Sequence, residues 1–319
     1  MFKLNREQRV CRIGPWAVGG QPGENPPLVV SSMFHNGDRI LESRKERKFD
    51  RVKARDYILR QEELSAQTGV GALVALVANS LDEMKTYIDF FLGVSEQPFG
   101  IDVWVEKTRL EAAAYAAGLG VHDRLLYNSI TPWDKDIAGQ VARLKELGVR
   151  HVVVQAFNQE DQTAAGRVSG LRKMLEIIGE DDFASILVDA ATMNLPSTAF
   201  SCLACRLMKE EFGWPAGVAS SNGTYMWKEA REMWGAEGFN AMNAAGQAVA
   251  AFLWTDLLFT GPIINLPKIL PAVATASMLL TTLAGGETGV LPAGPGHPVR
   301  RFFPDFAARL EEPPAAATN

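Results

Sequence analysis

Cysteine is scarce in this sequence. Only Cys11, Cys202 and Cys205 occur among the 319 residues. An odd and low number argues against a secreted disulfide scaffold and predicts a reducing, cytoplasmic environment. Cys202 and Cys205 form a C-x-x-C, but a second such pair and a nearby histidine pair are missing, and residues 197–212 have a helical pattern. We therefore interpret both as buried helix cysteines and expect no bound metal.

An excess of positive charge is missing as well. The net charge is -5 and the pI is about 5.5, which argues against broad nucleic-acid binding because phosphate neutralisation needs a basic surface. The amino-terminal segment MFKLNREQ has no apolar signal core. The long apolar run over residues 263–285 is interrupted by Pro267, Lys268 and Pro271. We expect a buried or subunit-packing helix there and no membrane insertion.

Nucleotide-binding motifs are also lacking. No G-x-G-x-x-G follows the first apolar segment, where a dinucleotide-binding fold needs it, and no P-loop occurs. Gly69 and Gly71 precede a strand-like segment, so we interpret them as a helix stop. These absences argue against a Rossmann sheet.

What the sequence does contain is a regular alternation of apolar and amphipathic segments. After a short hairpin cap (10–13 with 16–19), the predicted strands cover 28–34, 72–78, 99–103, 124–128, 151–156, 185–189, 216–220 and 254–259. The predicted helices cover 52–68, 81–92, 107–118, 134–147, 166–178, 198–212, 227–233 with 241–250, and 269–283. Apolar strands that alternate with helices indicate a parallel sheet, and eight units indicate a closed (β/α)8 barrel. We predict one α/β TIM-barrel domain over residues 1–310, followed by a disordered tail at 311–319.

Polar side chains end several of these predicted strands. Chemistry in such barrels gathers at the carboxyl ends of the strands. The candidate site residues are Asp102, Asn128, Gln155, Asn158, Asp189, Ser220 and Asn222. Asn222 stands in V-A-S-S-N-G-T-Y, which we interpret as a strand end running into a loop. No histidine, lysine or arginine ends a strand, which argues against metal hydrolysis, Schiff-base chemistry and phosphate binding.

Neutral hydrogen-bonding groups with two carboxylates suit a planar heterocycle such as a pterin. A buried carboxylate can accept from two adjacent N–H donors of an amino-pyrimidinone edge, and amides can pair with the remaining ring atoms. A methyl group leaves the pterin N5 only if that nitrogen is protonated or strongly hydrogen-bonded. A simpler interpretation, which stays open, is that each Asp or Asn only caps the helix that follows it.

Short sequence motifs strengthen the pterin interpretation. They are GGQPGE at 19–24, RQEELS at 60–65, YIDF at 87–90, YNSI at 127–130, AFN at 156–158 and VD at 188–189. In these motifs the chain resembles the pterin-binding methyltransferase superfamily, and most closely the H-subunit family of the tetrahydromethanopterin S-methyltransferases. The resemblance implies that Asp102, Asn128 and Asp189 hold the pterin and that Asn222 lies near N5. Asn222 and Asp102 are our candidate catalytic residues.

The resemblance implies methyl transfer between a methylated corrinoid protein and N5 of tetrahydrofolate, and we expect it to form methyltetrahydrofolate in a demethylation pathway. Tetrahydromethanopterin remains an alternative pterin, and the direction of transfer stays open. A dihydropteroate synthase-like activity is disfavoured, because the lysine and arginine expected near strands seven and eight are missing. The alternative from another functional class is a non-catalytic protein that binds pterin or assists assembly within a methyltransferase complex.

The expected partners follow from the same reasoning. No D-x-H-x-x-G corrinoid motif occurs, so the corrinoid must sit on a separate protein that docks at the barrel mouth. The charged loop at residues 35–55 is a candidate contact for that protein or for a folate tail, although a solvated charged loop is the favoured interpretation. The apolar closing helix at 269–283 predicts a homodimer.

Overall fold

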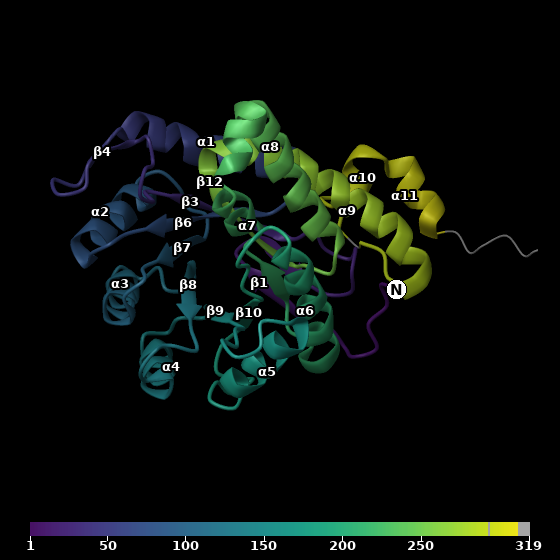
Figure 1. The fold of residues 1–319 in the computed structure, drawn as a ribbon, viewed down its shortest axis with the longest axis horizontal. Coiled ribbons are helices and arrows are strands. Elements are labelled where there is room, and N and C mark those ends of the chain that lie inside the picture. Colours follow the sequence, from purple (N-terminus) through teal and green to yellow (C-terminus); the bar gives the residue numbers. More distant parts are fainter. Residues whose placement is uncertain (293, 312–319) are drawn as a thin grey trace, which may run out of the picture.

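A computed structural model describes residues 1–292 and 294–311. Its centre is a closed barrel of eight parallel strands in the order β10-β11-β12-β3-β6-β7-β8-β9 (Figure 1). The strands are β3 (Leu28–Met33), β6 (Ala72–Val77), β7 (Phe99–Asp102), β8 (Leu125–Ile130), β9 (His151–Gln155), β10 (Ser185–Asp189), β11 (Ala216–Val218) and β12 (Leu257–Pro262). The predicted (β/α)8 barrel is confirmed.

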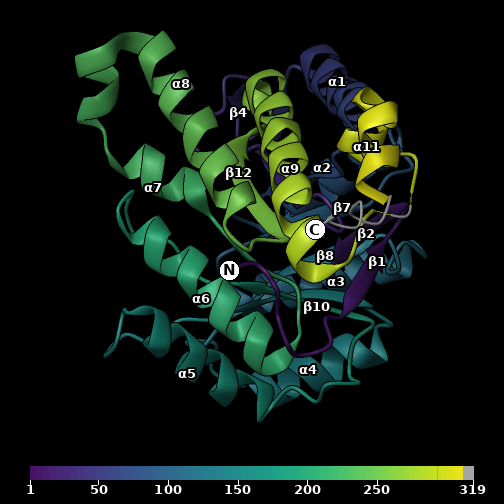
Figure 2. The same ribbon diagram turned by 90° about the vertical axis from the view of Figure 1, so that its right-hand side faces the viewer.

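Helices cover the outside of the barrel (Figures 1 and 2). They are α1 (Arg51–Thr68), α2 (Leu81–Leu92), α3 (Glu106–Gly118), α4 (Ile137–Glu146), α5 (Ala164–Leu175), α6 (Ser197–Phe212), α7 (Ser220–Met226), α8 (Glu229–Phe252) and α9 (Leu266–Thr288). Strands buried on both faces explain the nearly continuous apolar segments of the sequence: all five residues of β10 are buried.

The short amino-terminal hairpin is confirmed residue for residue. β1 (Val10–Ile13) pairs antiparallel with β2 (Trp16–Gly19) and covers the amino-terminal end of the barrel. Gly69 ends α1 in the left-handed conformation, at φ 74°, as a helix stop should. Gly71 permits close packing, because a Cβ atom there would lie 2.7 Å from Cγ of Trp16.

The segment after strand seven differs from the prediction. β11 ends at Val218, and the predicted loop from Ser220 onward is instead the short helix α7. Ser, Asn and Gly have low intrinsic helix propensity, so contacts with α8 stabilise the helical conformation here. The helices predicted at 227–233 and 241–250 form one longer run with a kink at Gly235, where φ is 66°.

The carboxyl-terminal part packs on α9. α10 (Pro298–Phe302) and α11 (Pro304–Glu311) lie beside it (Figure 1). Residues 263–288 are long and apolar enough to cross a membrane by length and composition alone, but half of the most apolar window is buried inside the protein. The disordered tail was predicted at residues 311–319, but Glu311 is the last residue of α11, and residues 312–319 lie outside the described residues.

The cysteines are free and buried, and Cys202 and Cys205 lie in α6 as predicted. Burial raises the pKa of Cys202 to about 12, so its thiol stays protonated near neutral pH. Within residues 1–292 and 294–311, no group of three or more His, Cys, Asp or Glu side chains is placed to hold a metal ion.

Candidate functional site

A cavity of about 320 Å³ opens at the carboxyl ends of the barrel strands. Five of the seven predicted site residues line it: Asp102, Asn128, Gln155, Asp189 and Asn222. They come from β7, β8, β9, β10 and α7. Residues far apart in the sequence therefore meet in one hollow, which is what the barrel topology predicts for strand ends.

The strand register places these residues in pairs. Asp102 and Asn128 are direct neighbours on β7 and β8, and Gln155 and Asp189 are direct neighbours on β9 and β10. Nε2 of Gln155 lies 3.4 Å from Oδ2 of Asp189. Each of these two pairs thus places one carboxylate beside one amide. Such a pair can both accept and donate hydrogen bonds in the plane of a ligand.

Both carboxylates are electrostatically unusual. Burial raises the pKa of Asp102 to about 6, and the charge of Arg109 only partly opposes this. Burial likewise raises the pKa of Asp189 to about 6, against a hydrogen bond from the backbone N–H of Ala191. Among the described residues the Asp102 side chain accepts no hydrogen bond. Carboxylates that titrate near neutral pH in a cleft are typical of functional sites.

Arg109 on α3 holds the wall beside Asp102. Its side chain, 3% exposed, donates to both carboxylate oxygens of Asp134 at 2.9 Å and to the Tyr127 hydroxyl at 3.1 Å. It also donates to the carbonyl oxygens of Val103 and Trp104, at 2.8 and 3.2 Å. One guanidinium therefore fixes the loops after β7 and β8 together.

A second buried arginine, Arg167 on α5, does the same for the loop after β10. It donates to the carbonyl oxygen of Ala190 at 2.7 Å and to that of Ala191 at 3.1 Å. Ala191 has a φ of 45°, an unusual conformation for a residue with a side chain. Because the N–H of Ala191 donates to Asp189, Arg167 fixes the backbone that orients that carboxylate.

Asn222 lies in the first turn of α7 and is exposed at the cavity. Its backbone N–H donates to the carbonyl oxygen of Ala219 at 2.9 Å. No protein partner holds its side-chain amide among the described residues. The amide is therefore available to a ligand, although it stands on a helix and not on the predicted loop tip.

Two predicted site residues lie outside the cavity lining. The Ser220 hydroxyl is buried and donates to Oε1 of Gln247 at 2.5 Å, so it joins α7 to α8. Nδ2 of Asn158 donates to the Ser169 hydroxyl at 3.2 Å, and Oδ1 accepts from the Glu160 backbone. Both make local structural bonds, which strand-end position alone could not distinguish from ligand contacts.

Sequence reasoning also missed part of the lining. The residues that line the cavity beyond the predicted set include Ser31, Ser32, Trp104, Arg109, Trp133 and Ser221. Ser31 and Ser32 interrupt an otherwise apolar strand, which was a usable signal. Arg109 lies on a helix and could not have been found from strand ends.

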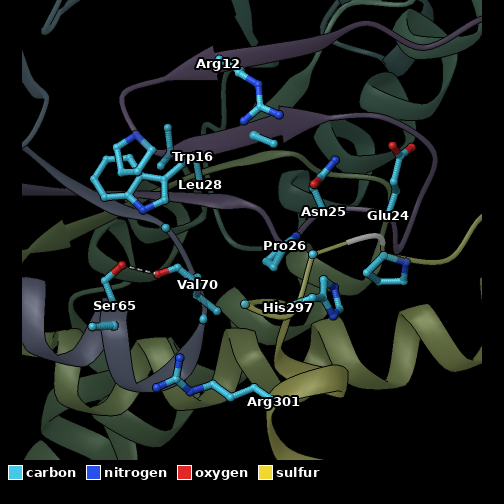
Figure 3. Close-up of a pocket in the computed structure, with 18 of the residues that line it drawn as sticks. Arg12, Trp16, Glu24, Asn25, Pro26, Leu28, Ser65, Val70, His297 and Arg301 are labelled. Atoms are coloured by element: carbon cyan, nitrogen blue, oxygen red, sulfur yellow. Dashed lines mark hydrogen bonds between the residues drawn. The ribbon is translucent and has the colours of Figure 1, made fainter. Parts of the chain in front are cut away.

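A different hollow of about 640 Å³ lies under the amino-terminal hairpin (Figure 3). Arg12 and Trp16 border it on one side, and His297 and Arg301 border it on the other. Leu28 and Gly71 place this hollow at the amino-terminal ends of the strands. In barrels of this type, that end of the barrel contributes to stability and the opposite end carries the active site. None of the predicted strand-end residues lines it, so the smaller cavity is the candidate active site.

Solved structures with this architecture identify the class of fold. The dihydropteroate synthase of Yersinia pestis superposes with a TM-score of 0.58 at 11% identity, covering 85% of this chain and 98% of that one. The enzyme from Xanthomonas albilineans gives a TM-score of 0.56 at 14% identity, covering 86% of this chain and 98% of that one. The protein is thus a (β/α)8 barrel of the dihydropteroate synthase type.

The family is defined by sequence. The family model described as tetrahydromethanopterin S-methyltransferase MtrH subunit matches residues 6–292, and the chain belongs to this family. The corresponding protein of Methanosarcina barkeri is 32% identical over 318 residues, covering 95% of this chain and all of that protein. The corresponding protein of Methanopyrus kandleri is 30% identical over 314 residues, covering 92% of this chain and 97% of that protein. Both relatives carry the name of the same methyltransferase component.

Proposed function

We propose that this protein is a methyltransferase that moves a methyl group between a corrinoid protein and N5 of tetrahydrofolate. One observation carries the proposal. Two carboxylates with a pKa of about 6, Asp102 and Asp189, share a cavity with the amide of Asn222, which has no protein partner among the described residues. Family membership supports the methyl-transfer chemistry.

The cavity residues divide into binding and transfer roles. An ionised carboxylate accepts two N–H donors from the amino-pyrimidinone edge of a pterin, and the amides of Asn128 and Gln155 extend that pattern. Binding a donor edge favours the ionised carboxylate and so lowers its pKa. We assign Asp102, Asn128, Gln155 and Asp189 to the pterin ring.

We assign Asn222 the role of hydrogen-bonding to N5 of the pterin. Methyl transfer requires N5 to present a lone pair in one direction and to leave as an amine in the other. An amide can donate to N5 or accept from its N–H, so one side chain serves both states. The amide is free to reorient because no protein group holds it among the described residues.

The methyl group's other carrier is proposed to be a corrinoid on a partner protein at the barrel mouth, where the corrinoid cobalt would accept or supply the methyl group. The charged loop predicted as a contact contains the hairpin of β4 (Leu41–Ser43) and β5 (Lys48–Phe49). Its cations are partly neutralised: Arg44 pairs with Glu83 at 2.9 Å and Arg47 with Asp82 at 3.6 Å. This internal pairing supports a structural role for the loop more than a docking role.

Calorimetric titration with tetrahydrofolate and 5-methyltetrahydrofolate tests the pterin assignment. Tetrahydromethanopterin, after which the relatives are named, is the competitor to include. Binding of neither pterin class would overturn the proposal, and binding of tetrahydromethanopterin alone would overturn the choice of tetrahydrofolate.

Methyl transfer is tested separately. Purified protein is mixed with tetrahydrofolate and methylcobalamin, and formation of methyltetrahydrofolate is followed. Asn222→Gln is the matched variant, because it keeps the amide but displaces it by one methylene group. Pterin binding without transfer, from free methylcobalamin or from a methylated corrinoid protein, would favour the non-catalytic assembly role.

Self-association is a further part of the proposal. Val249 on α8 and Leu279 and Leu283 on α9 are each more than half exposed. The two helices contact each other, and exposed apolar side chains on neighbouring helices favour a protein contact. We propose a homodimer through this face, and light scattering that shows only a monomer of 34.8 kDa would contradict it.

A further inference from the structure

Two exposed tryptophans stand at the rim of the cavity. Trp104 follows β7 and Trp133 follows β8, and their side chains are 80% and 45% exposed. Their rings are stacked, with centroids 6.0 Å apart and planes 27° apart. Phe157, after β9, meets Trp133 edge-on at 6.3 Å. Aromatic side chains from three successive loops thus form one row, and leaving such surface in water is unfavourable unless something covers it.

A groove continues outward from this row. This groove is a separate hollow of about 680 Å³ between α3 and α4, and both tryptophans line it. The apolar part of its lining includes Val105, Leu110 and Ala114. Because Trp104 and Trp133 also line the central cavity, the two hollows share one aromatic boundary. A ligand that reaches from the cavity past the indoles would enter this groove.

The aromatic boundary is held in place from below. Arg109 donates to the carbonyl oxygen of Trp104 at 3.2 Å and to Asp134, the residue after Trp133, through two bonds of 2.9 Å. The Asp134 carboxylate in turn accepts from the backbone N–H of Thr131 at 2.8 Å. Both loops are thus fixed before a ligand arrives, which reduces the entropy lost on binding.

We propose that Trp104 and Trp133 bind the arylamine ring carried on the C6 side chain of the reduced pterin. This inference rests on the proposed function, because it extends the pterin site outward. An aryl ring stacked on an indole gains dispersion and removes apolar surface from water. The groove carries charges of both signs, on Glu106, Lys107, Glu111, Lys135 and Arg143. Recognition there is therefore assigned to the aromatic ring and not to an anionic tail.

The experiment compares two ligands that differ in that ring. Tetrahydrofolate carries the arylamine, whereas 6-methyltetrahydropterin has the same bicyclic ring without it. Dissociation constants for both are measured by calorimetry on the full chain and on the double variant Trp104→Ala/Trp133→Ala. We expect the variant to bind tetrahydrofolate at least about 10-fold more weakly, or about 1.4 kcal/mol, while its affinity for 6-methyltetrahydropterin changes less than about 2-fold.

Two control variants accompany the measurement. Met226→Ala removes another exposed apolar side chain, 65% exposed and outside the cavity lining, and should leave both affinities unchanged. Trp104→Phe/Trp133→Phe keeps aromatic faces and should recover most of the tetrahydrofolate affinity. Recovery by phenylalanine would separate stacking from a loss of loop structure.

The outcomes are distinguishable. Wild-type protein that binds neither pterin overturns the proposed function and this inference with it. Wild-type protein that binds both ligands equally tightly, or a double variant that loses affinity for both, overturns the aryl subsite alone. A double variant with unchanged pterin affinities but slower transfer from a methylated corrinoid protein assigns the tryptophans to the partner protein and also overturns the subsite.

Discussion

Replacing Asp189 by asparagine is expected to stabilise the protein while removing pterin binding. Burial raises the pKa of Asp189 from 3.8 to about 6. That change corresponds to about 3 kcal/mol of unfavourable free energy for the ionised folded state. The asparagine Oδ1 can still accept from the Ala191 N–H, which now lies 3.0 Å from the carboxylate. We expect a net gain of about 1 to 3 kcal/mol above pH 7, because partial loss of the Gln155 contact offsets some of the benefit.

The pH dependence follows from the sign of the pKa change. Between pH 4 and 6 the folded protein holds the Asp189 proton more tightly than the unfolded chain does. The contribution of Asp189 to the free energy of unfolding therefore falls as the pH rises through that window. Above about pH 6 this contribution stays low. The asparagine variant lacks this dependence, so its advantage should be near zero at pH 4 and constant above pH 7.

Thermal unfolding from pH 4 to pH 8 measures the effect. For a chain of this size, about 1 kcal/mol corresponds to roughly 1.5 °C in Tm, so the expected rise above pH 7 is about 1.5–5 °C. Asp181→Asn, at an exposed carboxylate, is the matched control and should give no pH-dependent gain. A variant that is less stable than wild type at pH 8, or equally shifted at every pH, would refute the reasoning.

Three further predictions concern other residues. Asn222→Ala should keep the wild-type Tm, since the side chain is exposed and unbonded among the described residues, but lower turnover about 10- to 1000-fold; unchanged turnover would remove its role at N5. Ser220→Ala should cost about 1–2 kcal/mol in chemical denaturation by leaving Gln247 without its donor, with pterin affinity unchanged; weaker pterin binding at equal stability would instead support the ligand contact expected from the sequence. Lys209→Ala should cost about 3–5 kcal/mol, because it leaves the buried Asp256 carboxylate without its ion pair at 2.6 Å; a loss below about 1 kcal/mol in a urea titration would contradict this.

The barrel was predictable because its signals are periodic. Strands such as Ala72–Val77 are buried on both faces over nearly their whole length, so each stood out as one continuous apolar run. The order of the βα units in the sequence then predicted their order around the barrel. The prediction for Ser220 to Met226 was wrong because polar, small residues carry little preference, and packing against α8 decided the helical conformation.

The site was predictable only where it depends on strand ends. Asp102 and Asp189 each close an apolar strand, so topology alone placed them on one rim. Ser220 and Asn158 have the same local pattern but bond to Gln247 and Ser169, partners that sequence spacing did not reveal. Arg109 reaches the site from a helix, and that reach depends on side-chain direction in three dimensions.

Three aspartates with raised pKa values show how the barrel separates stability from function. Burial raises the pKa of Asp256 as well, but its carboxylate is bonded at 2.6 and 2.7 Å by Lys209, at the amino-terminal end. Asp102 and Asp189 have no salt-bridge partner within the described residues, although the buried cations Arg109 and Arg167 lie close by. Those arginines bond instead to Asp134 and to backbone carbonyl groups. The fold thus pairs the structural carboxylate with a cation and leaves the other two without a salt-bridge partner among the described residues. A ligand with adjacent N–H donors can supply hydrogen bonds to them.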